Sequence, residues 1–521
     1  MKKEFNITGT CIKEEHYMVD ISDKIKPIME LIKKGKYFII NKPRQYGKTT
    51  TFHQIWKCLE KTDEYLPIKL SFEGIGDEIF EDPKIFCPKF MEFMGESLTV
   101  KKRGLSEIFT KYVEEINSFD SLGKAITSAL NEINKKVVLL IDEVDKSSNN
   151  QLFLSFLGML RDKYLKQKEK ADISFYSVVL AGVYDVKTLK LKLSPEEEVK
   201  YNSPWNIAAE FKIDMAFSSR EIETMLEDYI NCTNAKLDVK IISERIYFYT
   251  SGYPFLVSKL CKVIEEDLGK KDWLIKDVDE AVKSLLKESN TNFDSIIQNI
   301  EKYSDLYKLV EKVILGNELV PFTISRPMIN LGMVLGVFKE KNGFVVIHNK
   351  IYEEYLTQHI VVGLQEKGLD DGITRNIINI SYIKPNGKLD LEKTLLKFQE
   401  VIKEKYSNTD LLKSDEFLEN NLRMLFFVFI KPIINGIGFS FKEVQTSEEK
   451  RMDVVIIFSD EKFVVELKIW RGQQYHKQGI GQLKEYMQKE GVKKGYMLIM
   501  DKNKNKQFAF EVEDGIFMVY L

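Results

Sequence analysis

The chain has 521 residues, a length that corresponds to roughly three or four domains. Hydrophobic residues make up 44% of the sequence and charged residues 30%, a balance that is typical of folded globular proteins and argues against extensive disorder. The net charge of −2 excludes a generally basic nucleic-acid coat, so any contact with nucleic acid must come from local clusters.

The cysteines and the hydropathy of the sequence argue against zinc-ribbon, disulfide-rich, secreted and membrane-spanning proteins. The five cysteines are far apart and form no C-x-x-C pair, so neither a zinc ribbon nor a disulfide framework is expected. The N-terminal sequence MKKEFNITGT lacks the apolar run of a secretory signal. The most hydrophobic run, Met424 to Ile430, is too short to span a bilayer, which takes about 20 apolar residues. We therefore expect a cytoplasmic protein with no membrane partner.

Residues 1–215 alternate short apolar runs with amphipathic stretches. The apolar runs are Tyr37–Ile40, Ile68–Phe72, Val137–Ile141 and Phe175–Ala181. Short apolar runs separated by helical patterns are typical of buried parallel strands. The sequence therefore predicts an α/β core built on a parallel sheet.

A phosphate-binding loop follows the first of these runs. Backbone N–H groups and a helix N-terminus bind phosphate oxygens in such a strand–loop–helix unit. Lys48 would reach the β- and γ-phosphates of ATP, and the Thr49 hydroxyl would bind Mg²⁺. Lys42 stands where the motif expects its first glycine. The predicted nucleotide-binding residues of the loop are Pro43, Arg44, Gln45, Tyr46, Gly47, Lys48, Thr49 and Thr50.

Two acidic residues follow the run Val137–Ile141. Asp142, at the end of the strand, can hold the water shell of Mg²⁺, and Glu143 can polarise the attacking water. Asp145 is an alternative for the base. These residues predict ATP hydrolysis as well as ATP binding.

The middle of the chain changes from α/β to helical patterns. A capping box at Ser218 and Glu221 opens a helical region over residues 216–290. Residues 291–365 predict helices followed by a hairpin, in which an Asn-Gly turn joins Met333–Lys339 to Phe344–Ile347. Helices followed by a hairpin suggest a winged helix, a module that binds DNA in some proteins and packs internally in others. Residues 366–404 predict a connecting segment with one short helix.

The region from residue 1 to about 365 resembles the AAA-like ATPases of the STAND class. The resemblance is carried by Pro43-Arg44-Gln45 in the phosphate loop, by the run from Asp142 to Asp145, and by Gly252-Tyr253-Pro254, which is similar to the G-x-P motif of their helical lid. It implies an ATPase core, a lid and a winged helix, with Pro254 lying against the nucleotide base. Tyr184 and Asp185 are the candidate sensor residues.

A second constellation lies in the last region, residues 405–521. Two apolar runs, Val454–Phe458 and Phe463–Lys468, flank a polar turn and predict a buried hairpin. A turn centred between residues 460 and 461 would place Asp453 opposite Lys468 and Val455 opposite Glu466. Because side chains alternate faces along a strand, Asp453, Glu466 and Lys468 would share one face. The alternative is an ordinary edge hairpin with a solvated Glu and Lys.

Two carboxylates and a lysine on an apolar hairpin are unfavourable unless they are used or paired. Oxygen ligands suit Mg²⁺ or Mn²⁺, which can activate water at a phosphodiester, and Lys468 can position that water. The D…E-x-K pattern resembles the PD-(D/E)XK nuclease superfamily, with Met452 in place of the proline. The resemblance implies a mixed-sheet α/β domain. It adds Gln482 to the catalytic residues and Glu419, or its neighbour Glu416, as a further metal ligand.

Together these patterns predict a regulatory ATPase that controls a nuclease domain, in defence or mobile-element biology. DNA is a more favoured partner than RNA, and a homo-oligomer is possible. The lysines between residues 493 and 506 can bind phosphates or form a solvated loop. The alternative function is a non-catalytic, nucleotide-dependent switch that grips nucleic acid or protein through its C-terminal domain.

Overall fold

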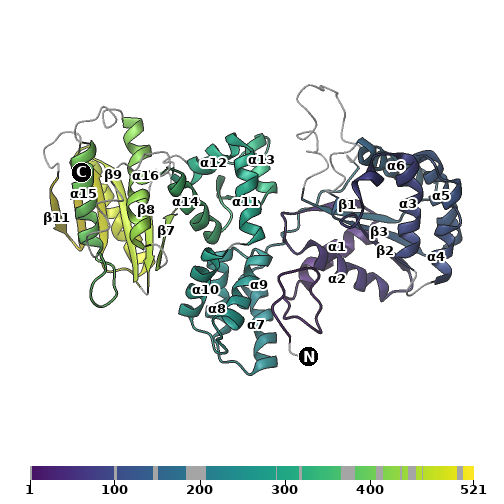
Figure 1. The fold of residues 1–521 in the computed structure, drawn as a ribbon, viewed down its shortest axis with the longest axis horizontal. Coiled ribbons are helices and arrows are strands. Elements are labelled where there is room, and N and C mark those ends of the chain that lie inside the picture. Colours follow the sequence, from purple (N-terminus) through teal and green to yellow (C-terminus); the bar gives the residue numbers. More distant parts are fainter. Residues whose placement is uncertain are drawn as a thin grey trace. The chain divides into compact units, whose positions relative to one another are not determined.

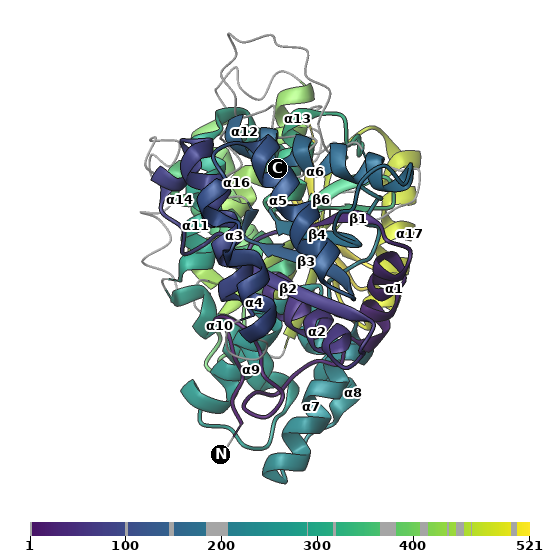
Figure 2. The same cartoon turned by 90° about the vertical axis from the view of Figure 1, so that its right-hand side faces the viewer.

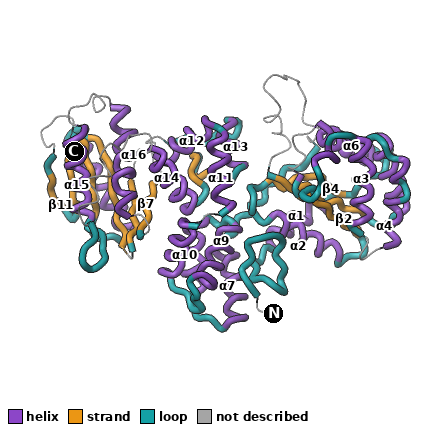
Figure 3. The backbone as a smooth tube through the Cα atoms, viewed as in Figure 1, coloured by secondary structure: helices purple, strands orange, loops and turns teal. Residues whose placement is uncertain are grey.

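The chain divides into two compact units. The first comprises Met1–Tyr247, Gly252–Trp273 and Val334–Gly336, and the second comprises Phe248–Ser251, Leu274–Met333 and Val337–Leu521. Figures 1 and 3 show the elements of each unit. The computed structural model describes residues 3–98, 103–144, 151–183, 207–288, 290–315, 319–364, 382–406, 415–434, 437–443, 453–459, 461–501 and 508–521.

The first unit is built on a four-stranded parallel sheet with the order β1-β4-β3-β2. Its strands are β1 (Tyr37–Asn41), β2 (Tyr65–Ser71), β3 (Lys136–Asp142) and β4 (Ser177–Gly182). Nearly all of their residues are buried, because helices cover both faces of a parallel sheet. The four predicted strands are therefore confirmed, with ends that shift by up to three residues.

Helices enclose this sheet on two sides (Figure 2). The apolar core on one side contains side chains of α3, α5 and α6, and the ring of Phe156 lies 5.3 Å from Phe86 and 4.9 Å from Phe90. Helices α1 and α2 lie against the sheet on the other side. The helices of this region are α1 (Ser22–Lys33), α2 (Lys48–Glu60), η1 (Asp77–Phe80), α3 (Pro83–Glu96), α4 (Arg103–Thr110), η2 (Val113–Glu115), α5 (Phe119–Glu132) and α6 (Gln151–Lys168).

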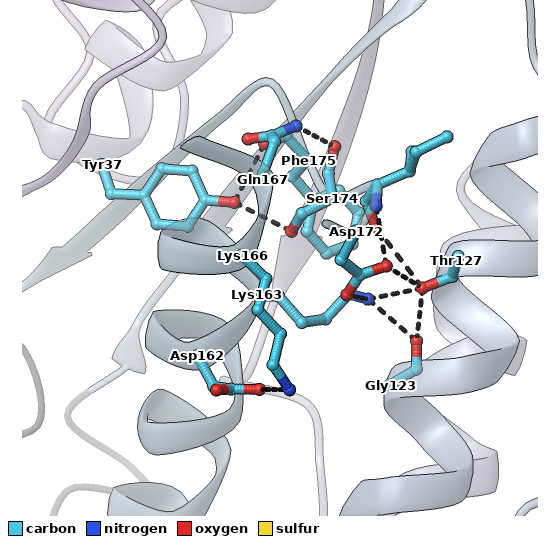
Figure 4. A network of polar contacts seen from close by, with 11 residues as sticks. Tyr37, Gly123, Thr127, Asp162, Lys163, Lys166, Gln167, Asp172, Ser174 and Phe175 are labelled. Atoms are coloured by element: carbon cyan, nitrogen blue, oxygen red, sulfur yellow. Dashed lines mark hydrogen bonds and ion pairs between the residues drawn. The ribbon is translucent and has the colours of Figure 1, made fainter. Parts of the chain in front are cut away.

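A buried polar network fixes the turn that leads into β4 (Figure 4). Lys163 of α6 is only 3% exposed, and its ammonium donates to Asp172 Oδ2 and to Thr127 Oγ1, each at 2.7 Å. Thr127 of α5 in turn donates to Asp172 Oδ1 at 2.7 Å. The Tyr37 hydroxyl of β1 donates to the Phe175 carbonyl at 2.9 Å. These bonds satisfy polar groups that burial would otherwise leave without water, and they join α5, α6 and β1 to the start of β4.

Further helices follow in the region predicted to form a lid. They are α7 (Ser219–Thr233), α8 (Val239–Thr250), α9 (Pro254–Lys262) and the π-helix η5 (Val263–Asp267), and all but the last residues of α8 belong to the first unit. The capping box predicted at the start of α7 is confirmed, because Ser218 Oγ accepts from the Glu221 N–H at 3.2 Å while Glu221 Oε2 accepts from the Ser218 N–H at 2.7 Å.

The second unit begins with helices and a short hairpin. The helices are α10 (Ile275–Lys287), α11 (Thr291–Lys302), α12 (Ser304–Leu315), α13 (Pro327–Val334) and α14 (Lys350–Leu364). The hairpin pairs β5 (Phe338–Lys341) with β6 (Phe344–Ile347), and both turn residues, Asn342 and Gly343, have positive φ angles of 53° and 84°. The predicted turn is confirmed, whereas the first strand starts later than predicted because α13 extends to Val334.

The predicted connecting segment at 366–404 is only partly a connection. Helix α15 (Leu391–Tyr406) spans 16 residues and contacts β12 (Ile516–Tyr520) and α16 (Asp415–Ile434). Its buried residues Leu391, Leu395, Phe398 and Ile402 recur with helical spacing. This helix therefore belongs to the C-terminal fold, which corrects the predicted connecting segment with one short helix, because packing against β12 and α16 decides where α15 lies.

A six-stranded mixed sheet forms the C-terminal fold, with the order β11-β12-β10-β9-β8-β7. The strands β7, β8 and β9 form an antiparallel meander, and β10 lies parallel to both β9 and β12. Helices α15 and α16 lie against these strands (Figure 1). The elements are α16 (Asp415–Ile434), β7 (Gly438–Glu443), β8 (Asp453–Phe458), β9 (Glu461–Ile469), α17 (Gln473–Glu490), β10 (Gly495–Met500), β11 (Phe510–Glu513) and β12 (Ile516–Tyr520).

The register of the β8–β9 hairpin differs from the prediction by two residues. Asp453 lies opposite Glu466, not opposite Lys468, and Val455 lies opposite Val464. The reason is a tighter turn, since Phe458 already pairs with Glu461 and Ser459 has a φ of 56°. A shift by two residues preserves the face of every side chain, so the predicted shared face survives the wrong register.

A buried ion pair joins two parts of the second unit. Glu354 of α14 is 1% exposed, and Lys431 of α16 donates to its Oε1 at 2.6 Å. The N–H of Ser440 in β7 donates to Glu354 Oε2 at 3.3 Å, and Lys431 also donates to the Ser440 carbonyl at 3.4 Å. The last helix of the predicted winged helix is thus bound to the edge of the C-terminal sheet.

Candidate functional site

A cavity of about 330 Å³ lies at the phosphate-binding loop of the first unit. The loop forms one wall, and residues of the predicted lid, which include Phe217 and Pro254, form another. The third wall comes from the N-terminal segment, residues 6–9 and 17–19. Sequence reasoning missed residues 6–9, because nothing in a short polar stretch marks it as part of a binding site.

The loop tolerates Lys42 because this position continues a strand. The Lys42 N–H donates to the Gly182 carbonyl at the end of β4, at 3.1 Å. The left-handed backbone that favours glycine occurs later in the loop, at Gln45 (φ 55°) and at Gly47 (φ 74°), directly before α2. A glycine at position 42 is therefore not required for this loop path.

Lys48 is held under the loop. The residue is 6% exposed, and its ammonium donates to the carbonyls of Lys42 at 3.0 Å and Pro43 at 2.8 Å. Of the other predicted nucleotide-binding residues, Pro43 and Arg44 do not line the cavity as the described residues define it. The predicted loop residues that do line it are Gln45, Tyr46, Gly47, Lys48, Thr49 and Thr50.

Of the two predicted acidic residues at the end of β3, only one lines the described cavity. Asp142 is 2% exposed, does not line the cavity as described, and accepts the Glu143 N–H at 3.0 Å. Glu143 does line the cavity and has a φ of 55°. Lys69 on β2 is a missed neighbour: burial lowers the pKa of Lys69, and the charge of Asp142 opposes that shift. Asp145, Tyr184 and Asp185 lie outside the described residues.

The predicted G-x-P motif, Gly252-Tyr253-Pro254, has a clear steric reason for its glycine. Gly252 has a φ of 72°, and its carbonyl accepts the Phe217 N–H at 2.8 Å. A Cβ at this position would lie 1.8 Å from the Phe217 carbonyl oxygen, a contact that no side chain can make. Pro254, which starts α9, then lines the cavity.

Three predicted residues of the C-terminal constellation come together in the second unit. The side chain of Glu466 is 1% exposed, and its Oε1 lies 3.3 Å from Lys468 Nζ, whose own side chain is 10% exposed. Lys468 also donates to Gln482 Oε1 on α17 at 3.1 Å. Asp453 lies opposite Glu466 in the sheet. The side chains of Asp453, Glu419 and Glu416 are outside the described part of the structure.

Arg423 of α16 is a member of this region that sequence reasoning missed. It is 1% exposed and close enough to Glu466 for the two charges to interact, while burial lowers the pKa of Arg423 to about 9. One signal for it existed, since an arginine stands next to the apolar run that begins at Met424. Among the described side chains, no group of three or more His, Cys, Asp or Glu is arranged to hold a metal ion.

A comparison with protein families decides the class of the first two-thirds of the chain. The family model of the AAA-like domain matches residues 12–358. The chain belongs to the AAA-like domain family. This AAA-like protein therefore has a P-loop ATPase fold with a nucleotide-binding site. Residues 390–504 match a domain of unknown function (DUF8371), and that match begins one residue before α15.

Solved structures with some likeness to this AAA-like protein share 12–13% of its sequence. The Walker-type ATPase PABY2304 of Pyrococcus abyssi has a TM-score of 0.46 at 12% identity and covers 68% of this chain and 99% of its own. The ORC2 protein of Aeropyrum pernix has a TM-score of 0.39 at 12% identity and covers 67% of this chain and 93% of its own. RuvB of Thermotoga maritima, the Holliday junction branch migration motor, has a TM-score of 0.35 at 13% identity and covers 68% of this chain and 98% of its own. All three TM-scores lie below 0.5, and the family assignment rests on the family model alone. The search of curated proteins found no match to this sequence.

The surface features bear on partners in two ways. Lys494, one of the lysines considered for phosphate binding, forms an ion pair with Glu392, whereas Lys493 is exposed and residues 502–507 lie outside the described chain. Within the described parts, none of the helices has the length and apolar character needed to cross a membrane.

Proposed function

We propose that this AAA-like protein binds and hydrolyses ATP and that its nucleotide state controls a metal-dependent nuclease site in its C-terminal fold. The observation that carries the nuclease part is the contact of buried Glu466 with Lys468 on β9 and of Lys468 with Gln482 on α17, beside a hairpin that sets Asp453 opposite Glu466. Buried charges are unfavourable unless they are paired or used. The proposed domains are those predicted, except that the C-terminal domain begins at α15.

In the nucleotide site, Lys48 would turn from the loop carbonyls to the β- and γ-phosphates of ATP, beside the amides of the loop and of the first turn of α2. Thr49 and Asp142 would hold Mg²⁺, which neutralises phosphate charge when bound. Glu143 would polarise the attacking water, and Pro254 would lie against the base. The oxygen donors at the loop and at the end of β3 suit Mg²⁺. Membership of the STAND class remains part of this proposal.

In the C-terminal site, Asp453, Glu466 and Glu419 would hold Mg²⁺ or Mn²⁺. The ion would supply hydroxide and stabilise charge at the phosphodiester. Lys468 would orient the attacking water, and Gln482 would hold the Lys468 ammonium in place. Carboxylate oxygens are the donors that these ions prefer, which supports the proposal. DNA is the proposed substrate, and homo-oligomerisation and a role in defence or mobile elements remain fold-level analogies.

The buried pair of Glu354 and Lys431 supports a physical link between the two activities. It binds α14, at the end of the proposed winged helix, to α16 and to Ser440 on β7. Breaking such a pair leaves a buried charge without compensation, which is strongly destabilising. A nucleotide-driven movement of the winged helix would therefore move the edge of the C-terminal sheet with it.

One observation favours a second candidate function, the non-catalytic switch. Glu466 faces two cations, Lys468 and the buried Arg423, so its charge is already balanced without a metal ion. In that case the cluster would stabilise the fold of a domain that grips nucleic acid or protein.

The test is a cleavage assay on the full chain. Supercoiled plasmid, linear duplex, single-stranded DNA and RNA are incubated with ATP and Mg²⁺ or Mn²⁺, or with EDTA. We expect cleavage that EDTA abolishes and that Glu466→Gln removes, whereas Glu485→Gln, an exposed glutamate on α17, retains it. ATP binding without cleavage of any substrate would favour the switch.

A further inference from the structure

We infer that Tyr253 of the lid is a positioning residue for phosphate binding, because it fixes the orientation of the Arg44–Gln45 peptide in the loop. The inference rests on the proposed ATP binding and adds a residue to that site.

Tyr253 contacts the loop at two places. Its hydroxyl donates to the Arg44 carbonyl at 2.6 Å. Its ring packs against the ring of Tyr46 in an edge-to-face arrangement, with centroids 4.8 Å apart and planes at 79°. Both rings are buried, at 2% and 5% exposure. A single lid residue thus contacts two of the three residues that precede Gly47.

The hydrogen bond has a consequence for the amide of the next residue. A trans peptide is planar, so its C=O and N–H groups point in opposite directions. When Tyr253 holds the Arg44 carbonyl, the Gln45 N–H must point away from Tyr253. Gln45 lines the cavity and has a φ of 55°, a conformation that non-glycine residues seldom adopt without help from their surroundings. The bond therefore stabilises a peptide orientation in which the Gln45 N–H points away from Tyr253, and in the ATP-bound protein this amide would donate to a phosphate oxygen.

The position of Tyr253 is itself tightly set. Its predecessor Gly252 is fixed against Phe217, and its successor Pro254 starts α9 and lines the cavity. The Val257 N–H donates to the Tyr253 carbonyl at 3.0 Å, so the residue is held by the first turn of that helix. One short segment of the lid therefore contacts the phosphate loop through Tyr253 and the cavity through Pro254.

The test compares two tyrosine-to-phenylalanine variants of the full chain. Tyr253→Phe removes only the hydroxyl bonded to the Arg44 carbonyl. The control is Tyr229→Phe, because Tyr229 is also a buried lid residue, 1% exposed, whose hydroxyl donates to a carbonyl, that of Lys271 at 3.2 Å, and it does not line the described cavity. Affinities for ATP, ADP and adenosine are measured by competition against a fluorescent ATP analogue.

We expect Tyr253→Phe to weaken ATP and ADP binding roughly three- to tenfold, the effect of one neutral hydrogen bond, and to leave adenosine binding unchanged. Tyr229→Phe should change none of the three. An equal loss for all three ligands, or unchanged ATP affinity, would overturn the inference. A wild-type protein that binds no ATP would instead refute the proposed function, so the two failures are distinct. Retained adenosine binding by Tyr253→Phe would also show that its cavity is folded.

Discussion

The two proposed sites are built in different ways. The nucleotide cavity depends on backbone shape, since a loop with left-handed angles at Gln45 and Gly47 leads into a helix N-terminus. The C-terminal cluster depends on side chains from separate elements, with Glu466 and Lys468 on β9, Gln482 on α17 and Arg423 on α16. A backbone site leaves a contiguous sequence signature, whereas a side-chain site leaves residues whose meeting depends on register and packing.

This difference predicts that the two sites fail independently. The nucleotide site lies within the first unit and the charged cluster within the second. Variants that remove chemistry from one site should therefore leave the chemistry of the other intact, unless control rather than chemistry is measured.

The largest effect is expected at Glu143. Glu143→Gln should lower the ATP turnover number by roughly 100- to 10,000-fold, the range for loss of a general base, with ATP affinity unchanged. Steady-state phosphate release and an equilibrium nucleotide titration would measure the two quantities. Equal turnover in variant and wild type would transfer the base role, with Asp145 as the next residue to test.

A smaller loss is expected at the C-terminal cluster. Glu466→Ala and Lys468→Ala should each lower DNA cleavage by roughly 100- to 1,000-fold, because the first removes a proposed metal ligand and the second removes the cation that would orient the attacking water. ATP turnover should not change in either variant. If both activities fell together, the distinction between two independent sites would be wrong.

Nucleotide affinity should respond most to Lys48. Lys48→Ala should weaken ATP binding by roughly 10- to 100-fold, as expected for loss of charge-assisted hydrogen bonds to phosphate. Lys61→Ala, at the exposed C-terminal end of α2, serves as the control and should not affect affinity. Unchanged affinity in Lys48→Ala would remove the proposed role of the loop.

The smallest effect on activity, but a clear one on stability, is expected in the polar network of Figure 4. Lys163→Met should lower the free energy of unfolding by about 3 kcal/mol, because it leaves Asp172, with a side chain 19% exposed, without its cation. Lys166→Met removes an exposed ion pair with Asp162 and should lower the free energy of unfolding by less than about 0.5 kcal/mol. Urea unfolding of both variants would measure the difference, and equal losses would mean that the network does not hold the sheet as described.

Sequence reasoning succeeded where one short segment carries the information. The four strands of the first sheet, the capping box at Ser218 and the Asn342-Gly343 turn all follow from local patterns. The shared face of Glu466 and Lys468 also follows, because alternation is local.

It failed where distant packing decides. The register of β8 and β9 depends on a two-residue turn that a polar tetrapeptide does not specify, and α15 joins the C-terminal fold through its contact with β12. The proximity of Arg423 to Glu466 depends on how α16 packs on the sheet, and the N-terminal wall of the cavity depends on how residues 6–9 cross the first unit. None of these arrangements leaves a local signature.

The central claim, that nucleotide state controls the C-terminal site, is tested most directly by the rate of DNA cleavage in Mg²⁺ with and without ATP. Wild type, Glu143→Gln and Lys48→Ala are compared on the same substrate. We predict that ATP changes the cleavage rate of the wild type. Glu143→Gln, which should bind ATP without hydrolysing it, should keep the cleavage rate of the ATP-bound protein. Lys48→Ala should cleave at the same rate with and without ATP. The same cleavage rate in all three proteins, with and without ATP, would contradict the account.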